Sequence, residues 1–128
     1  MPALPWKRFA AVEPETECTV MGSRLPLRKH RSIPGFLRWT LRIRGQLAET
    51  PGLIGYALDA KLTRKTFFTV SAWRSRADLE RFVETDPHHT GIEAIRPHMA
   101  PSQFVFWTCP ARELPVRFDE VRRRLDAS

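Results

Sequence analysis

Two segments rich in aromatic and β-branched residues limit what this chain can fold into: residues 65–73 (KTFFTVSAW) and residues 103–109 (QFVFWTC). Both have the composition that β-strands favour. Alternate residues of a strand point to opposite faces of a sheet, and in these strands both faces are apolar. In the first segment Phe67 and Trp73 lie on one face and Phe68, Val70 and Ala72 on the other; in the second, Phe104 and Phe106 oppose Val105 and Trp107.

A sheet built from these strands needs a cover on each face. Helices packed on one face would leave the other apolar face in water, and an exposed apolar patch of that size is unusual on a soluble monomer. A second copy of the chain, packed sheet to sheet, is the simplest cover. We therefore predict a homodimer that forms through the sheet face.

Proline, glycine and helical spacing divide the chain into elements. Their β-α-β-β-α-β order is the ferredoxin-like pattern, so we predict an α+β fold in which helices cover one face of an antiparallel sheet, with an extra C-terminal helix. The expected elements are a strand at 18–25, a helix opened by Pro34 and Gly35 and ended at 50–52, strands at 53–62 and 65–73, a helix capped by Ser75 and Asp78, a second helical piece after Asp86-Pro87 from His88 to Met99, a strand at 103–109 and a helix at 113–125.

Length and composition indicate one globular domain. The 128 residues are divided into a loosely held, Pro-rich lead-in at 1–16 and a single domain at 17–128. No apolar run approaches the ~20 residues of a membrane span, and the N-terminus lacks a secretory-signal pattern. Cys18 and Cys109 form no CxxC pattern and are expected to be reduced. We therefore expect a cytoplasmic protein with no membrane partner.

Five stretches of the sequence resemble a known group of proteins. The chain resembles the dimeric α+β barrel superfamily over residues 19–108, and within it the antibiotic-biosynthesis monooxygenase-like proteins and their relatives of the spheroidene monooxygenase type. The matching stretches are TVSAW (69–73), LERFV (79–83), DPHH (86–89), FVFW (104–107) and TPGLIGYAL (50–58).

The resemblance implies a ferredoxin-like fold, a homodimer, and a pocket between sheet and helices in each subunit. Several relatives oxidise polycyclic aromatic substrates with O2 and no metal or organic cofactor. Others bind or degrade haem through a helix histidine, and others have no known activity. The cofactor-free oxygenases often carry an asparagine four residues before the tryptophan, where this chain has Thr69.

His88 is the first candidate for a site residue. Ile92, Ile95 and Met99 follow it at helical spacing, so His88 shares their apolar face and is expected to point inward. Such a histidine can be a core residue bonded to a backbone carbonyl. It can also be a general base or a haem ligand in a pocket. The adjacent His89 points about 100° away on a helix, so the pair does not chelate one metal, and we predict no metal site.

Trp73 and Tyr56 are the other candidates. Trp73 ends its strand and either anchors the core or a dimer interface, or stacks on a flat aromatic ligand. Tyr56 is the only tyrosine; it is either a buried, satisfied hydroxyl or a hydrogen-bond partner for a phenolic substrate. The small residues on the opposite face of its strand, Gly55 and Ala57, are expected to leave room for a ligand.

We interpret the chain as a monooxygenase-like protein acting on an aromatic or polyketide-type small molecule in an apolar pocket. Such a protein needs no cofactor; the alternative is a haem-binding protein with His88 on the iron. A non-catalytic dimer that binds a small apolar or aromatic ligand is a further alternative. RNA-recognition domains share the element order, and the formal charge of +7 permits nucleic acid, but residues 65–73 lack their glycine-containing pattern, and we expect no nucleic-acid partner. No P-loop, dinucleotide fingerprint, nucleophile elbow or HExxH motif is present.

Overall fold

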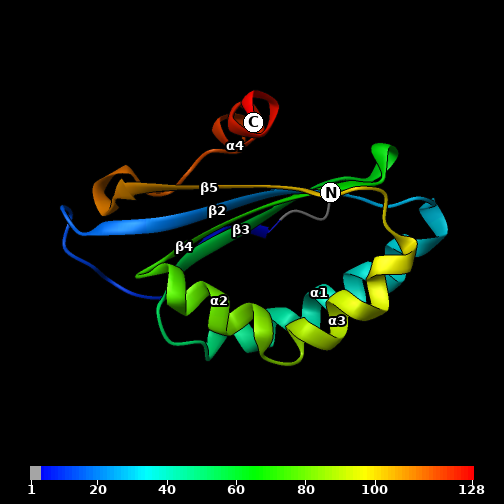
Figure 1. Cartoon of the computed structure of the whole chain (residues 1–128), viewed down its shortest axis with the longest axis horizontal. Helices are drawn as coiled ribbons and strands as arrows, with labels where there is room; N and C mark the ends of the chain where they lie inside the picture. Colours follow the sequence, from blue (N-terminus) through cyan, green and yellow to red (C-terminus); the bar gives the residue numbers. More distant parts are fainter. Residues whose placement is uncertain (1–3) are drawn as a thin grey trace.

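The computed structural model describes residues 4–128, which form a five-stranded antiparallel sheet and helices on both of its faces (Figure 1). The strand order is β1-β3-β4-β2-β5, and every neighbouring pair is antiparallel. The four strands from β2 onward reproduce the ferredoxin-like arrangement, so the predicted fold class is confirmed. The strands are β1 (Leu4–Arg8), β2 (Glu17–Pro26), β3 (Leu53–Lys61), β4 (Thr66–Trp73) and β5 (Gln103–Pro110).

The helices form two unequal layers (Figure 1). α1, α2 and α3 lie together on one side of the sheet, and α4 lies on the other. Short 3-10 turns join several elements. In the described part of the chain the helices are α1 (Ile33–Ala48), α2 (Arg76–Glu84), α3 (His88–Ile95) and α4 (Phe118–Ala127), and the 3-10 turns are η1 (His30–Ser32), η2 (Leu62–Arg64), η3 (Arg96–His98) and η4 (Ala111–Glu113). From Leu4 to the C-terminus, no helix combines the length and the apolar character needed to cross a membrane.

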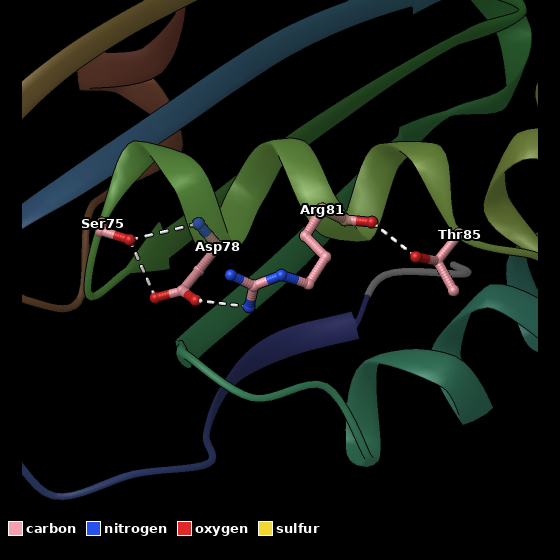
Figure 2. A network of polar contacts seen from close by, with 4 residues as sticks. All are labelled: Ser75, Asp78, Arg81 and Thr85. Atoms are coloured by element: carbon pink, nitrogen blue, oxygen red, sulfur yellow. Dashed lines mark hydrogen bonds and ion pairs between the residues drawn. The ribbon is translucent and has the colours of Figure 1, made fainter.

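The start of α2 follows the predicted cap. Ser75 Oγ accepts a hydrogen bond from the Asp78 backbone N–H at 3.1 Å and donates one to Asp78 Oδ2 at 2.9 Å (Figure 2). Arg81 donates from Nη1 to Asp78 Oδ1 at 3.0 Å, and the Thr85 hydroxyl donates to the Arg81 carbonyl at 2.6 Å. These bonds satisfy backbone groups at both ends of a nine-residue helix. They hold α2 in place directly after the end of β4.

The α1–α3 side of the sheet carries most of the aromatic core. Phe67 of β4 is fully buried and stacks on Phe36 of α1, with ring centroids 4.2 Å apart. At the far end of the same strand, Trp73 packs with Phe82 of α2 at 5.3 Å. Burying side chains of this size contributes on the order of 2 kcal/mol each. The two aromatic pairs therefore fix the helical layer to both ends of β4.

The opposite face of the sheet is covered by α4. The apolar pattern of the strands predicted that a second copy of the chain would cover this face, and that prediction is wrong for its centre. Val121 and Leu125 of α4 are fully buried in a cluster with Phe68, Val70 and Ala72 of β4. The chain therefore buries the centre of its own second apolar face. Helical spacing alone does not say which face a terminal helix packs on, so the sequence left this cover unassigned.

Three element boundaries also differ from expectation. Leu4–Arg8 lies within the expected lead-in but forms strand β1. It pairs with the free edge of β3, although prolines are frequent in this part of the sequence. The last helix begins at Phe118 and not at residue 113, because Pro115 biases the residue before it away from helical geometry. The helical piece from His88 ends at Ile95, with Pro97 inside the 3-10 turn that follows.

Gly22 of β2 allows α4 to lie close to the sheet. A Cβ atom built on Gly22 would lie 2.9 Å from Val121 Cγ1 and 3.3 Å from Val105 Cγ1. The first of these contacts is shorter than real Cβ atoms make and the second is tight, so a larger residue here forces the helix and the strand apart. Gly45, on the exposed side of α1, has no atom within 4 Å of its built Cβ.

We predict opposite effects for alanine at these two glycines. Gly22→Ala is expected to lower the free energy of unfolding by about 1–3 kcal/mol, because it overpacks the α4 contact. Gly45→Ala is expected to raise it by up to about 1 kcal/mol, because alanine favours the helix interior more than glycine does. Urea denaturation of both variants measures the difference. Equal stability of the two variants would show that α4 does not pack against Gly22.

Candidate functional site

The predicted site residues lie on the α1–α3 side of the sheet. Trp73 is 1% exposed, and its indole N–H donates to Ser71 Oγ at 2.8 Å. Ser71 is itself buried, two residues earlier on the same face of β4. The indole is therefore fixed by packing and by one hydrogen bond. Its N–H is already used, so a ligand that reached this residue would contact the ring and not the N–H.

Tyr56 lies beside this tryptophan in the same buried cluster. It is directly opposite Ser71 in the β3–β4 register, and its ring stacks on Phe9 with centroids 5.6 Å apart and planes 13° apart. Burial raises the pKa of the Tyr56 hydroxyl, and the nearby Arg44 cation lowers it in part. The phenol therefore stays protonated at neutral pH and can donate a hydrogen bond.

His88 is the first residue of α3 and is half-buried. Its ring lies against Phe82, with centroids 4.8 Å apart, and Nδ1 is 3.2 Å from the Val83 carbonyl oxygen. A carbonyl only accepts, so Nδ1 carries the proton and Nε2 is the basic nitrogen. Burial lowers the pKa of His88, although the bond to Val83 raises it in part. The ring is therefore neutral at neutral pH, with a basic lone pair on Nε2.

Phe82 lies between two of the candidate residues, Trp73 and His88. From the sequence it was predicted only to belong to the apolar face of its helix. Its ring contacts both Trp73 and His88, whereas among the described residues these two rings have no ring contact with each other. Phe82 also lines a groove of about 420 Å³ between α2 and the end of α1, together with Asp78 and Arg81 of Figure 2. It therefore lies between this groove and the buried tryptophan. Apolar spacing predicted that Phe82 is buried, but not what it joins.

Gln46 is a second residue that the sequence did not single out. Its amide nitrogen donates to the carbonyls of Phe82 at 3.3 Å and Thr85 at 3.1 Å, and its amide oxygen accepts from the His88 backbone N–H at 2.9 Å. One side chain of α1 thus satisfies three backbone groups where α2 ends and α3 begins. These bonds fix the position of His88. No sequence signal marks such a contact, because glutamine is common on exposed helix faces.

Hydroxyl groups, not an amide, occupy the middle of the sheet on this side. Thr69, at the position where the cofactor-free oxygenases that the sequence resembles often carry asparagine, is hydrogen-bonded to the buried Ser23 across the β2–β4 register. Each hydroxyl satisfies the other, so the pair needs no ligand. The predicted space opposite Tyr56 is also filled: a Cβ on Gly55 would lie 2.6 Å from the Trp6 ring. That part of the interpretation is wrong, because β1 brings an indole over the glycine.

Within residues 4–128, no three histidine, cysteine or acidic side chains gather closely enough to hold a metal ion. His89 is exposed and lies 3.4 Å from Glu93 on its own helix. The site therefore consists of a buried tryptophan, a buried tyrosine and a neutral histidine, positioned by Ser71, Phe82 and Gln46.

Comparison with known proteins identifies relatives of the fold. No protein-family model matches the sequence, and no curated protein matches it. Solved structures do match. A protein from Nitrosomonas europaea assigned as an antibiotic biosynthesis monooxygenase is 20% identical, with a TM-score of 0.63 over 70% of this chain and 95% of that chain. SnoaB, a cofactor-independent oxygenase from Streptomyces nogalater, is 15% identical, with a TM-score of 0.62 over 78% and 99%. A Caulobacter crescentus protein with the same assignment as the first is 19% identical, with a TM-score of 0.61 over 76% and 92%.

These matches cover nearly the full length of the solved chains. They show that this chain has the ferredoxin-like α+β fold of antibiotic biosynthesis monooxygenase-like proteins, as the sequence resemblance predicted. Identities of 15–20% establish the fold and not the reaction.

The lowered pKa of His88 predicts how stability depends on pH. Its ordinary value is 6.5, so just below that pH the unfolded chain binds a proton that the folded chain does not. This contribution to stability is complete above about pH 7 and is lost as the pH falls through 6.5 toward the lowered value. We expect the free energy of unfolding to fall less between pH 7.5 and pH 5 in His88→Gln than in wild type. An equal fall in both proteins, measured by urea denaturation, would contradict a lowered pKa.

Proposed function

We propose that the protein is a monooxygenase-type enzyme that acts on a flat aromatic or polyketide-type small molecule on the α1–α3 side of the sheet. The observation that carries this proposal is the neutral His88, with a basic Nε2, in contact through Phe82 with a buried tryptophan. The fold shared with antibiotic biosynthesis monooxygenase-like proteins supports the same class.

The proposed reaction needs a base, an apolar site and dioxygen. His88 Nε2 removes a proton from an activated methylene of the substrate, and the resulting anion is delocalised over the aromatic rings. The anion reacts with O2: one oxygen atom becomes the new carbonyl oxygen, and the other leaves as water with the two methylene hydrogens. The balance is CH2 + O2 → C=O + H2O. Few waters compete for the anion in apolar surroundings, which favours this chemistry.

The remaining residues have binding and positioning roles in this proposal. Tyr56 keeps its proton at neutral pH and so can donate to a substrate oxygen. Trp73 presents its ring, because its N–H is held by Ser71. Phe82 separates Trp73 from the groove on α2, so substrate entry requires this ring to move aside.

The test is oxygen consumption with anthrone, a tricyclic ketone with an activated methylene. Wild type is expected to consume one O2 per anthrone oxidised, faster than the buffer reaction. His88→Gln is expected to lower kcat by about 100-fold or more, as for loss of a general base. His89→Gln is the matched control, because this neighbouring ring is exposed, and it should keep wild-type kcat. Equal rates in the two variants, or no enzyme-dependent consumption, would overturn the proposal.

Haem is the alternative ligand that His88 suggests, since Nε2 is a suitable donor for iron. The surroundings of the ring do not fit this group. His88 lies against Phe82 and lines neither the groove at α2 nor the larger groove at the start of α1, so any ligand at Nε2 requires Phe82 to move aside, and a porphyrin needs more space than a tricyclic substrate. We therefore favour the cofactor-free reaction.

A homodimer is proposed through β5, because this edge strand retains exposed aromatic residues. Phe104 is 53% exposed and Phe106 is 42% exposed, on the side of β5 opposite α4. Among the strands of residues 4–128, β5 pairs only with β2, which leaves its other edge open. A second copy related by a two-fold axis can cover the same strip on both chains.

Phe104→Ser with Phe106→Ser is expected to convert the dimer to a monomer of 14.8 kDa. The two changes remove apolar surface from the proposed contact and leave the core intact, because both rings are exposed. Light scattering after gel filtration measures the mass. Leu41→Ser is the control, because Leu41 is 62% exposed on α1, away from β5, and it should leave the dimer intact. A monomeric wild type would contradict the dimer.

We also propose the cytoplasm as the compartment. Cys18 and Cys109 are directly opposite in the β2–β5 register and are both free and buried. Burial raises the pKa of the Cys109 thiol to about 11, so the group is protonated and unreactive. Facing thiols that remain unpaired are typical of a reducing compartment.

A further inference from the structure

Three long stretches of the sequence contain no aspartate or glutamate: residues 18–48, 60–77 and 94–112. The chain has 14 acidic residues in all, so these stretches collect its basic residues without opposing charge. Neither the fold nor the proposed reaction requires this distribution. It raises the question of whether the stretches meet in space.

The three stretches meet at one end of the molecule, where backbone hydrogen bonds join them. Leu27 N–H donates to the Lys65 carbonyl at 2.7 Å, and Arg28 N–H donates to the His98 carbonyl at 2.9 Å. In Figure 1 the start of α1, the η2 turn and the end of α3 all lie at the right of the view. This end is separate from Trp73, which lies at the opposite end of β4 from Phe67 and its partner Phe36.

A groove of about 690 Å³ opens at this end between α1 and the η3 turn. Its lining combines cations with an apolar floor and contains no acidic residue. Leu27, Phe36 and Ile95 on the floor are buried, while Trp39 is half-buried. The guanidinium of Arg42 stacks over Trp39 at 4.8 Å from the ring centroid. Arg42 therefore covers one face of Trp39, and the groove offers an apolar floor beside this ring, bordered by the positive charge of Arg28, Lys29 and Arg31.

The cations of the groove are not neutralised by the protein. Ion pairs elsewhere in the described chain engage many of its basic residues, but none involves Arg28, Lys29 or Arg31. Arg28 is nevertheless held in place, because its Nε donates to the Met99 carbonyl at 2.7 Å. A fixed guanidinium with no carboxylate partner beside an apolar floor favours an oxyanion carried on an apolar body.

We propose that this groove binds a small molecule that joins a flat apolar ring system to a carboxylate or phosphate group. The ring lies on the apolar floor of the groove beside Trp39, and the oxyanion lies among Arg28, Lys29 and Arg31. The volume of the groove lies within the range of about 300–1,000 Å³ that is typical of small-molecule sites. This site is independent of the proposed reaction at Trp73 and His88.

A pair of probes with the same shape and different charge tests the proposal: 2-naphthoate and its neutral amide, 2-naphthamide. Calorimetry with full-length protein is expected to give a Kd for the naphthoate at least about tenfold lower than for the amide, because only the former gains charge-assisted hydrogen bonds. NMR of the wild type should place the naphthoate shifts at the backbone amides of Ser32, Gly35 and Ala94, which line the groove. Equal affinity for the two probes would overturn the proposal.

Two triple variants distinguish an effect of the groove cations on naphthoate binding from an effect of the net charge of the protein. Arg28→Gln, Lys29→Gln and Arg31→Gln together are expected to weaken naphthoate binding at least about tenfold. The control, Lys7→Gln, Arg8→Gln and Arg38→Gln together, removes the same charge from exposed positions outside the groove and should change Kd by less than about twofold. Equal losses would overturn the proposal, as would NMR shifts confined to Trp73, Tyr56 and His88. Tighter binding of a single-stranded oligonucleotide at the same amides would overturn it in favour of nucleic acid.

Discussion

The structure depends on covering a sheet that is apolar on both sides. One chain meets this requirement with two different layers, three helices on one face and a single helix on the other. The single helix is short, and Val121 and Leu125 are its fully buried contacts with this face, in a cluster centred on β2 and β4. A close approach matters more for a short helix than for a long one, because it has few side chains with which to exclude water. The absence of a side chain at Gly22 is therefore as important to the fold as the buried residues around it.

Much of the architecture could be predicted from local signals. Hydrophobic periodicity and turn residues correctly predicted the strand segments, the Ser75 cap and the helix break at Asp86-Pro87. Interactions between residues close in the sequence determine these features. The covering of the second face and the strand at Leu4–Arg8 depend on long-range pairing, which no spacing rule reports. The three candidate residues were named from the sequence, but the residues that position them were not. Gln46 and Phe82 act through contacts between elements, and a single sequence does not encode those in any local pattern.

The two ends of the helical layer differ in their chemistry. At the end near Trp73 the buried side chains are aromatic, and burial favours the neutral form of both titratable rings, the imidazole of His88 and the phenol of Tyr56. At the end near Phe36 the floor is also apolar, but its rim is cationic. α1 runs the length of both regions, with its first turn at the cationic groove and Gln46 in its last turn. One helix of 16 residues therefore contributes to both regions.

The three hydrogen bonds of Gln46 restrict what can replace it. The side chain must donate hydrogen bonds to two carbonyls and accept one from a backbone N–H, and it must be long enough to reach all three groups. Glutamate of the same length accepts but cannot give, so its negative charge would face two carbonyl oxygens. Lysine has no acceptor, and methionine has no donor. Asparagine has the right groups on a stem that is one carbon too short. The junction between α2 and α3 therefore restricts which residue can stand about 40 positions earlier in the chain, on α1.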